Sequence, residues 1–264
     1  MTDKELKELQ LYGLEILKEV DKFCRKNNIK YSLGEGTLLG AIRHKGFIPW
    51  DDDIDIYMTR DNFDKFITTF KSNEYRVEYF NTLKNYWLPF AKVRMLKETK
   101  FYTPEIAKIS DFTGPRIDIL PLDYVPSLKS KEQDKQGKKV KFWKTILRNK
   151  CYPIGKKKKF HYYLIVPFAK ILPYKYIVNR VEYWLKKYDN IKCDYVVNTS
   201  GDYNVRKETF PKYYFDELIE TKFEDSKFFV SKYYDEVLTK IYGDYMTPPP
   251  VEKRVVKHYV VVKK

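Results

Sequence analysis

Four aspartates lie within the five residues 51–55, and isoleucines occupy positions 54 and 56. On a strand, Asp51, Asp53 and Asp55 would point to one face, while the two isoleucines would point to the other. Three carboxylates side by side repel one another unless a cation lies between them. Because oxygen-only ligands suit Mg²⁺ or Mn²⁺, this run predicts a strand that is buried on one face and binds metal on the other.

Two simpler interpretations of the acidic run fit less well. A solvated acidic turn would have no reason to alternate acids with isoleucines. A calcium-binding EF-hand loop starting at Asp51 needs glycine at its sixth position and glutamate at its twelfth, where this chain has Ile56 and Asn62. A metal-binding strand at residues 53–57 is therefore the prediction.

A glycine turn lies shortly before the acidic run. Residues 29–33 are expected to form a short strand, which the glycines at 34 and 36 would break, and Thr37 is expected to cap a helix that runs through His44. A helix N-terminus after such a turn offers free N–H groups to an anion. The turn alone is more often a structural loop, but its position next to the acids favours phosphate binding. The predicted binding residues are Gly34, Glu35, Gly36 and Thr37.

One acid stands in a later apolar strand. Asp118 lies between two isoleucines in the expected strand 116–120, where a charge is costly unless it is paired or bound to metal. On a strand next to the acidic run, Asp118 would complete a carboxylate triad with Asp53 and Asp55. Asp123 is the alternative third acid.

Basic residues near these acids are candidates for contacting phosphate. Two of them alternate along an expected strand at 90–95, so both would face the same side, a pattern that is also typical of a solvated strand face. Another, near the C-terminus, would pair either with a phosphate or with Asp244. The candidates are Arg43, His44, Lys92, Arg94 and Arg254.

The net charge of +15 is concentrated in one segment. Between Lys129 and Lys159, thirteen basic residues stand against two acids, so this stretch carries +11 (13 − 2). Residues 131–149 are expected to form a helix, followed by the run Lys156–Lys159 and an aromatic, helix-like stretch at 162–188. The segment is either a solvated helical insertion or a surface for anionic lipid, with lysines at the headgroups and aromatic rings at the interface.

Composition narrows the class of protein. Only ten of the 51 basic residues are arginine, whereas nucleic-acid readers favour arginine forks, so no nucleic-acid partner is expected. Three widely spaced cysteines suggest neither a disulfide framework nor a zinc cluster. The chain starts without an apolar signal segment, and its longest apolar stretch is too short to span a bilayer. We expect a cytoplasmic protein, associated with the inner face of the membrane if the basic segment binds lipid.

The order of expected elements is helix, strand, helix, strand, helix and then several strands, which indicates a mixed sheet with helices packed on it. A chain of 264 residues suffices for one large domain or for one domain with a helical subdomain. We therefore predict an α+β fold with a helical, basic and aromatic insertion. The expected parts are a catalytic core at 1–128, the insertion at 129–190 and a C-terminal part at 191–264 that completes the core.

Five stretches of the sequence match one known family. They read GEGTLLGAIRH at 34–44, GFIPWDDDID at 46–55, PFAKVR at 89–94, IDILPLD at 117–123 and YGDYM at 242–246. In these motifs the chain resembles the LicD family, and the resemblance covers most of the chain except about residues 129–190. It implies a nucleotidyltransferase-like fold.

The resemblance also implies a reaction. LicD-like enzymes transfer phosphocholine from CDP-choline to a sugar hydroxyl of a cell-surface glycan precursor, of the teichoic acid or lipopolysaccharide type, and release CMP. The acceptor would be a lipid-linked glycan at the inner leaflet. Relatives of the fukutin type imply ribitol phosphate transfer from a CDP donor as an alternative. Glycerol phosphate transfer and a CTP-dependent nucleotidyltransferase are further alternatives.

The implied site combines metal and base. Asp53, Asp55 and Asp118 would hold one or two Mg²⁺ or Mn²⁺ ions against the diphosphate, and Asp118 or Asp51 would take the proton of the attacking hydroxyl. Choline would need an aromatic cage, for which Trp87 is the candidate. A glycosyltransferase with a DxD motif is disfavoured because the acids follow a glycine turn so early in the chain. A non-catalytic binding module would tolerate replacement of these aspartates.

Overall fold

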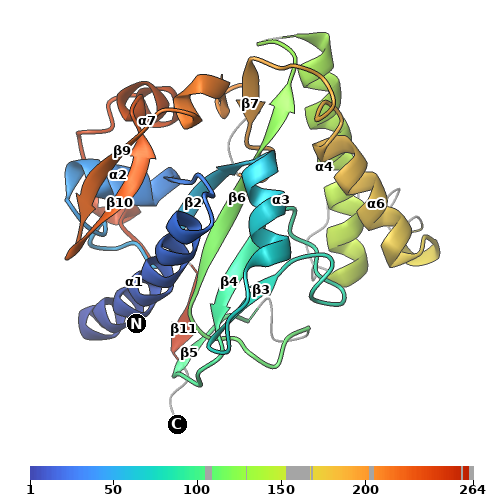
Figure 1. Cartoon of the computed structure of the whole chain (residues 1–264). Coiled ribbons are helices and arrows are strands. Elements are labelled where there is room, and N and C mark those ends of the chain that lie inside the picture. Colours follow the sequence, from blue (N-terminus) through green and yellow to red (C-terminus); the bar gives the residue numbers. More distant parts are fainter. Residues whose placement is uncertain are drawn as a thin grey trace.

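The computed structural model of the protein describes residues 1–104, 109–128, 130–152, 167, 169–201, 205–256 and 258–261. Six helices and two short 3-10 turns lie within these ranges, around a central sheet (Figure 1). The helices are α1 (Asp3–Lys26), α2 (Glu35–Arg43), α3 (Arg60–Thr69), α4 (Lys131–Cys151), α6 (Tyr174–Leu185) and α7 (Tyr234–Tyr242), and the 3-10 turns are Lys212–Phe215 and Val251–Lys253.

The central sheet has seven strands: five follow the order β1-β2-β6-β4-β3, and β7 extends the sheet by pairing with both β6 and β8. Two further pairs, β9 with β10 and β5 with β11, lie outside this sheet. The strands are β1 (Ser32–Leu33), β2 (Asp55–Thr59), β3 (Tyr75–Glu78), β4 (Ala91–Met95), β5 (Phe101–Tyr102), β6 (Arg116–Val125), β7 (Tyr195–Val197), β8 (Thr209–Pro211), β9 (Leu218–Phe223), β10 (Ser226–Ser231) and β11 (Val260–Val261).

Strand directions make this a mixed sheet. β2 and β6 run parallel and place Asp55 directly opposite Asp118, whereas β1, β3, β4, β7 and β8 pair with their neighbours in antiparallel fashion. Helices α1 and α3 pack against the sheet. The predicted α+β fold with a mixed sheet and flanking helices is confirmed, and so is the prediction that the strand of Asp118 lies beside the acidic run.

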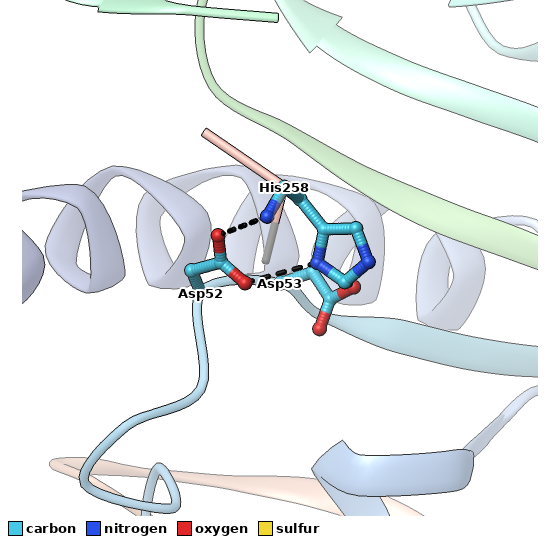
Figure 2. A group of neighbouring side chains, drawn as sticks. All are labelled: Asp52, Asp53 and His258. Atoms are coloured by element: carbon cyan, nitrogen blue, oxygen red, sulfur yellow. Dashed lines mark hydrogen bonds and ion pairs between the residues drawn. The ribbon is translucent and has the colours of Figure 1, made fainter. Parts of the chain in front are cut away.

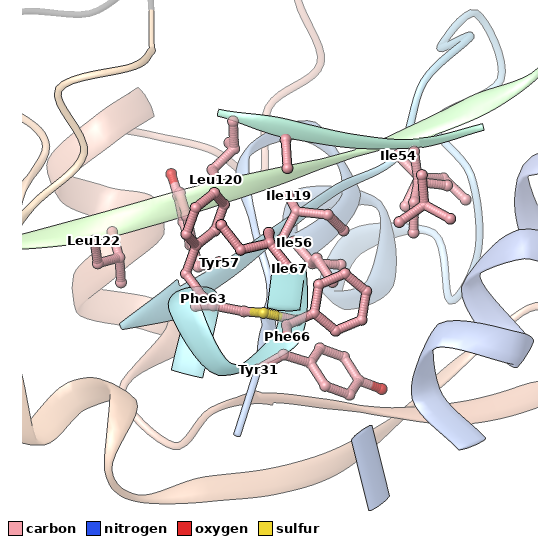
Figure 3. Close-up of a cluster of buried hydrophobic side chains, with 14 of the residues drawn as sticks. Tyr31, Ile54, Ile56, Tyr57, Phe63, Phe66, Ile67, Ile119, Leu120 and Leu122 are labelled. Carbon is pink, nitrogen blue, oxygen red and sulfur yellow. The ribbon is translucent and has the colours of Figure 1, made fainter. Parts of the chain in front are cut away.

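The isoleucines of the acidic run enter the core. Ile54 and Ile56 are buried and belong to the same cluster as Phe63, Phe66 and Ile119 (Figure 3). Regular strand structure nevertheless begins only at residue 55, two residues later than expected, because the ladder with β6 starts at that position. The alternation of apolar and acidic side chains therefore extends into the segment that leads up to β2.

Helix α2 begins earlier than the sequence suggests. Its first residue is Glu35 and its N-cap is Gly34, so the prediction of Thr37 as the cap is wrong. The physical reason is that the hydroxyl of Thr37 accepts a hydrogen bond from the backbone N–H of Asp55 at 2.9 Å. This side chain ties the helix to β2 instead of capping the helix.

The basic segment forms α4, within two residues of the predicted helix 131–149. Helix α6, which falls in the predicted stretch 162–188, packs along α4 (Figure 1). Buried side chains of both helices belong to the same hydrophobic cluster as the sheet. Lys129 and the run Lys156–Lys159 lie outside the described residues. In the described part of the chain, no helix is long and apolar enough to cross a membrane.

Candidate active site

A cleft of about 570 Å³ lies between the first residues of β2 and β6, the start of α2 and the C-terminal segment. Half of the predicted site residues line it, and the other half do not. Those that line it are Glu35, Gly36, Arg43, Asp51, Asp53, Asp55 and Asp118. Its described walls do not include Gly34, Thr37, His44, Trp87, Lys92, Arg94 or Arg254.

The carboxylates in the cleft destabilise one another's ionised forms. Burial, followed by the charges of Asp53 and Asp52, raises the pKa of Asp51 well above its ordinary value. Burial and the charges of Asp53 and Asp118 likewise raise the pKa of Asp55. Because carboxylate oxygens are the ligands that hard divalent cations prefer, a cation between these groups would relieve the repulsion.

Asp118 differs from the other acids because it already has cationic partners. Lys92 Nζ donates to both of its carboxylate oxygens at 2.7 Å, and Arg116 Nε lies 3.4 Å from one of them. Burial opposes the shift, but these two cations lower the pKa of Asp118. Burial and the charge of Arg116 in turn lower the pKa of Lys92 to about 8. Lys92, expected to face phosphates, is instead buried and holds the Asp118 carboxylate in place.

Arg94 is a partner in a buried ion pair. Its guanidinium is fully buried and donates to Glu78 Oε1 at 2.8 Å and to the carbonyl of Gly114 at 2.6 Å. Lys92 and Arg94 do lie on the same strand, but acids of the neighbouring strands β3 and β6 bind both of them. The structure thus gives both side chains a buried carboxylate partner, and their contact with phosphate stays a prediction.

Asp123, the alternative third acid, serves the core. It is fully buried, accepts from Arg60 Nε at 2.8 Å and from the hydroxyl of Thr199 at 3.2 Å. Burial outweighs these contacts and raises the pKa of Asp123 to about 6. Because Asp118 lines the cleft and Asp123 does not, Asp118 is the acid that joins the acidic run.

The glycine turn holds the acidic strand in position. The N–H of Gly34 donates to the carbonyl of Asp55 at 2.9 Å, next to the bond that Thr37 makes with the same residue. Gly36 lines the cleft, and a Cβ atom at this position would lie 2.7 Å from Asp51 Oδ2. A larger residue at position 36 would therefore displace the Asp51 carboxylate. Gly34 and Thr37 were expected to contact phosphate; in the structure they bind the backbone of Asp55.

Glu35 has a strained backbone at the start of α2. Its φ angle is +42°, a left-handed conformation that residues other than glycine adopt only at an energetic cost. Such strained residues cluster at functional sites. Its carboxylate accepts from the hydroxyl of Tyr57 at 2.6 Å, the amide of Asn198 at 3.3 Å and the hydroxyl of Tyr242 at 3.5 Å. Three separate parts of the fold therefore keep this carboxylate at the cleft.

The two basic residues after the glycine turn bond to each other. Arg43 Nη1 donates to the carbonyl of Tyr245 at 2.6 Å, and Arg43 Nε lies 3.0 Å from His44 Nε2. Burial and the charge of Arg43 lower the pKa of His44, so its neutral ring can accept this hydrogen bond. Arg43 lines the cleft, whereas His44 does not and contacts Arg43 instead.

Arg254 contacts the rim of the cleft. Its guanidinium lies 4.9 Å from the centre of the Trp50 ring, and its Nε donates to the carbonyl of Pro249 at 2.9 Å. The alternative partner expected from the sequence, Asp244, accepts instead from the hydroxyl of Thr247 at 2.7 Å. Arg254 therefore packs on an aromatic ring that lines the cleft.

His258, near the C-terminus, reaches the acidic run (Figure 2). Its backbone N–H donates to Asp52 Oδ2 at 2.7 Å, and its Nδ1 lies 2.9 Å from Asp52 Oδ1 and 3.0 Å from Asp53 Oδ2. Burial opposes the shift, but these contacts raise the pKa of His258 to about 10. The three side chains place possible ligand atoms within 4.8 Å of one another and could hold a metal ion. Sequence reasoning missed His258, since a lone histidine so far along the chain carries no local signal.

Aromatic residues of the cleft differ from the expected one. Trp87 is 5% exposed and stacks on Tyr152, with ring centres 5.2 Å apart and an interplanar angle of 18°. It belongs to the core, and the prediction that it contacts choline in the cleft is not supported by its position. The aromatic residues that line the cleft are Trp50, Phe90, Tyr242 and Tyr245.

A mixed sheet with acids on adjacent parallel strands, preceded by a glycine turn, defines an enzyme of the nucleotidyltransferase type. The chain belongs to the LicD/FKTN/FKRP family of nucleotidyltransferase domains, whose profile matches residues 28–167. It is 35% identical to the lipopolysaccharide cholinephosphotransferase LicD of Haemophilus influenzae over 274 aligned positions, which cover 96% of each chain. An uncharacterized protein of Rickettsia typhi is 42% identical over 78 residues, 28% of this chain and 25% of the relative. An uncharacterized protein of Rickettsia prowazekii is 32% identical over 115 residues, 39% and 43% respectively.

Proposed function

We propose that this enzyme transfers phosphocholine from CDP-choline to a sugar hydroxyl of a lipid-linked, cell-surface glycan precursor and releases CMP. The full-length similarity to a lipopolysaccharide cholinephosphotransferase supports both the transferred group and the glycan acceptor. A lipopolysaccharide-type acceptor is favoured over a teichoic acid for the same reason. We further propose that the reaction takes place at the cytoplasmic face of the membrane.

The observation that carries this function is the meeting of the acids in one cleft. Asp55 and Asp118 are paired across two parallel strands, and Asp51 and Asp53 line the same cleft. Burial and the charges of neighbouring carboxylates raise the pKa values of Asp51 and Asp55. A cation between these acids would stabilise their ionised forms and would let an anionic diphosphate approach them. Asp53, Asp55 and Asp118 would therefore hold Mg²⁺ or Mn²⁺, and the metal would neutralise charge on the diphosphate.

Asp51 is the better candidate for the base. A base must bind a proton readily, and the pKa of Asp51 is raised, whereas Lys92 and Arg116 lower that of Asp118. We propose that Asp51 takes the proton of the attacking sugar hydroxyl. The sugar oxygen then bonds to the choline-bearing phosphorus, and the bond from that phosphorus to the bridging oxygen breaks, so that CMP leaves.

The cleft's aromatic residues would bind the choline headgroup. A quaternary ammonium is recognised by aromatic faces, and Trp50, Phe90, Tyr242 and Tyr245 line the cleft. In the proposed division into parts 1–128, 129–190 and 191–264, the acids come from the first part and the two tyrosines from the last. Both parts would thus be needed for one site.

The test is incubation of the protein with Mg²⁺, a glycan acceptor and, separately, CDP-choline, CDP-ribitol and CDP-glycerol, with CMP release as the readout. CMP formation with CDP-choline, its loss in EDTA and its restoration by Mg²⁺ or Mn²⁺ are expected. If another CDP-alcohol is preferred, the transferred group is that phospho-alcohol and not phosphocholine. Pyrophosphate release from CTP would instead establish a nucleotidyltransferase, and full activity after exhaustive chelation would exclude the metal-dependent reaction.

A further inference from the structure

Helices α4 and α6 present a surface that combines lysines with exposed aromatic rings. On α4, Lys135, Lys138, Lys139 and Phe142 recur at the spacing of one helix face. Phe142, Tyr176 and Tyr183 are 43%, 47% and 46% exposed, respectively. We call this surface the α4–α6 face. Its residues are Lys135, Lys138, Lys139, Phe142 and Trp143 of α4, Tyr176, Arg180 and Tyr183 of α6, and Lys187, which follows α6.

Ring contacts join the two helices into one continuous surface. The rings of Trp143 and Tyr176 lie 6.0 Å apart and meet edge to face. The guanidinium of Arg180 lies 5.6 Å from the centre of the Trp143 ring and 5.0 Å from that of Tyr183. Lys187 Nζ donates to the Tyr183 hydroxyl at 2.8 Å. Because Lys135 of α4 also acts electrostatically on Tyr183 of α6, lysines and rings from both helices share one surface.

The charge of this face is strongly positive. Its residues include five cations and no acid. The nearest acid on the same part of α4, Asp134, is engaged by Arg206 at 2.7 Å, and Glu132 lies at the helix start. Four of the five cations are lysines, which act as mobile point charges suited to a diffuse anionic surface, whereas fixed recognition of one phosphate favours arginine.

Exposed rings beside lysines match the chemistry of a lipid interface. Tyrosine and tryptophan rings prefer the headgroup level of a bilayer, where one end is apolar and the other wet. Lysines around them would bind anionic headgroups. Contact of this kind is peripheral, which agrees with the finding that no described helix could span a membrane.

The opposite side of α4 is anchored at the cleft. Lys144 Nζ donates to the carbonyl of Thr199 at 2.9 Å and to that of Ser200 at 3.4 Å, and Ser200 lines the cleft. The same helix therefore connects the α4–α6 face to the cleft wall. A bilayer on this face would be held at a set distance from the catalytic acids.

We propose that the α4–α6 face docks the protein on an anionic lipid bilayer. Docking would present a lipid-linked acceptor to the cleft, and this consequence rests on the proposed function, whereas the docking itself does not. Binding to vesicles therefore tests the surface without any substrate.

The experiment measures cosedimentation of the full-length protein with vesicles of phosphatidylcholine alone and of phosphatidylcholine mixed with phosphatidylglycerol. The charge variant carries Lys135→Gln, Lys138→Gln and Lys139→Gln. We expect preferential binding of the parent to the anionic vesicles at low salt and an affinity about 100-fold lower in the charge variant, because each lysine near such a surface contributes about a factor of five.

The matched control removes three exposed lysines elsewhere, by Lys22→Gln, Lys26→Gln and Lys71→Gln. Its net charge equals that of the charge variant, so a general effect of net charge would weaken both equally. Such equality, or equal binding of the parent to neutral and anionic vesicles, would overturn the proposal.

A second variant tests the rings. Phe142→Ser combined with Tyr183→Ser should lower vesicle affinity at least about tenfold, and the loss should persist at high salt, where charges are screened. If the face instead joins two copies of this chain, light scattering will show a dimer mass for the parent and a monomer mass for the ring variant, while both bind vesicles equally well. That result would overturn the proposal.

Activity separates the two hypotheses. CMP release with a soluble sugar acceptor should be unchanged in all three variants, since none alters a cleft residue. If the parent releases no CMP but its vesicle binding follows the expected pattern, the proposed function fails and the docking surface stands. If CMP release is normal and vesicle binding does not follow the pattern, the docking surface fails alone.

Discussion

Replacing Asp52 with alanine should release the C-terminal segment from the cleft. Asp52 is 5% exposed, and its carboxylate accepts from the backbone N–H groups of His258 at 2.7 Å and Tyr259 at 3.1 Å, as well as from the His258 ring at 2.9 Å. Hydrogen bonds to a charged group contribute roughly 1.5–3 kcal/mol each. Two of the three bonds, taken at the low end, amount to about 3 kcal/mol, which corresponds to about a 100-fold change in an opening equilibrium.

Amide hydrogen exchange at His258 and Tyr259 measures this opening directly. In Asp52→Ala, exchange there should accelerate about 100-fold, while core amides should change little. Asp244→Ala is the matched control, because it also removes one carboxylate, but that carboxylate lines the cleft and accepts from Thr247 instead. Exchange at 258 and 259 as slow in Asp52→Ala as in the parent would refute the assignment of Asp52 as the anchor.

The histidine adds a pH dependence to this anchor. The pKa of His258 is raised from 6.5 to about 10, so the folded state binds the proton more tightly than the unfolded state. The resulting stabilisation is fully present below the unfolded pKa and is lost as the pH rises through the folded pKa. After correction for the intrinsic chemical rate, amide exchange at residues 258 and 259 should therefore become faster between pH 6.5 and pH 10 in the parent. In His258→Gln the corrected rate should not change over this range.

Three further predictions concern the cleft and its supports. Asp53→Asn and Asp55→Asn should each reduce CMP release roughly 10³-fold or more, while the melting temperature without metal holds or rises because like-charge repulsion is relieved; near-normal turnover with Mg²⁺ would contradict the metal-site assignment. Arg94→Met should lower the free energy of unfolding in urea by about 2–3 kcal/mol, because it removes one of the two cations that contact buried Glu78, the other being Arg76. The KM for CDP-choline should not change, and a raised KM at unchanged stability would argue for phosphate contact. Trp87→Leu should lower the melting temperature and leave that KM unchanged, whereas a raised KM would restore Trp87 as a headgroup ligand.

Local patterns predicted the central strands of the fold and the acids that meet at the cleft. Alternation of acids and isoleucines assigns side chains to opposite faces through covalent geometry alone, and Ile54 and Ile56 are indeed buried. The apolar surroundings of Asp118 marked it as an acid in need of a partner, and it lies opposite Asp55 in the sheet. Both inferences needed only a few consecutive residues.

The roles of the basic residues could not be predicted in this way. Alternation puts Lys92 and Arg94 on one face of a strand, but the strand register decides what that face meets. Because β4 lies between β3 and β6, Glu78 and Asp118 reach these cations and leave neither at the cleft wall. Because an unpaired charge at these buried positions would be costly, each cation stays with its carboxylate and holds it in position.

The sequence by itself determined the acidic run, the glycine turn, the family and the order of elements, because each depends on neighbouring residues or on a recognisable motif. Only the tertiary structure decided which distant groups complete the cleft. His258 meets Asp52 across 206 positions of the chain, and Asp118 rather than Asp123 faces the cleft because Arg60 binds Asp123 in the core. Such contacts arise from strand pairing and packing between segments far apart in the chain, and no local periodicity encodes which segments will meet.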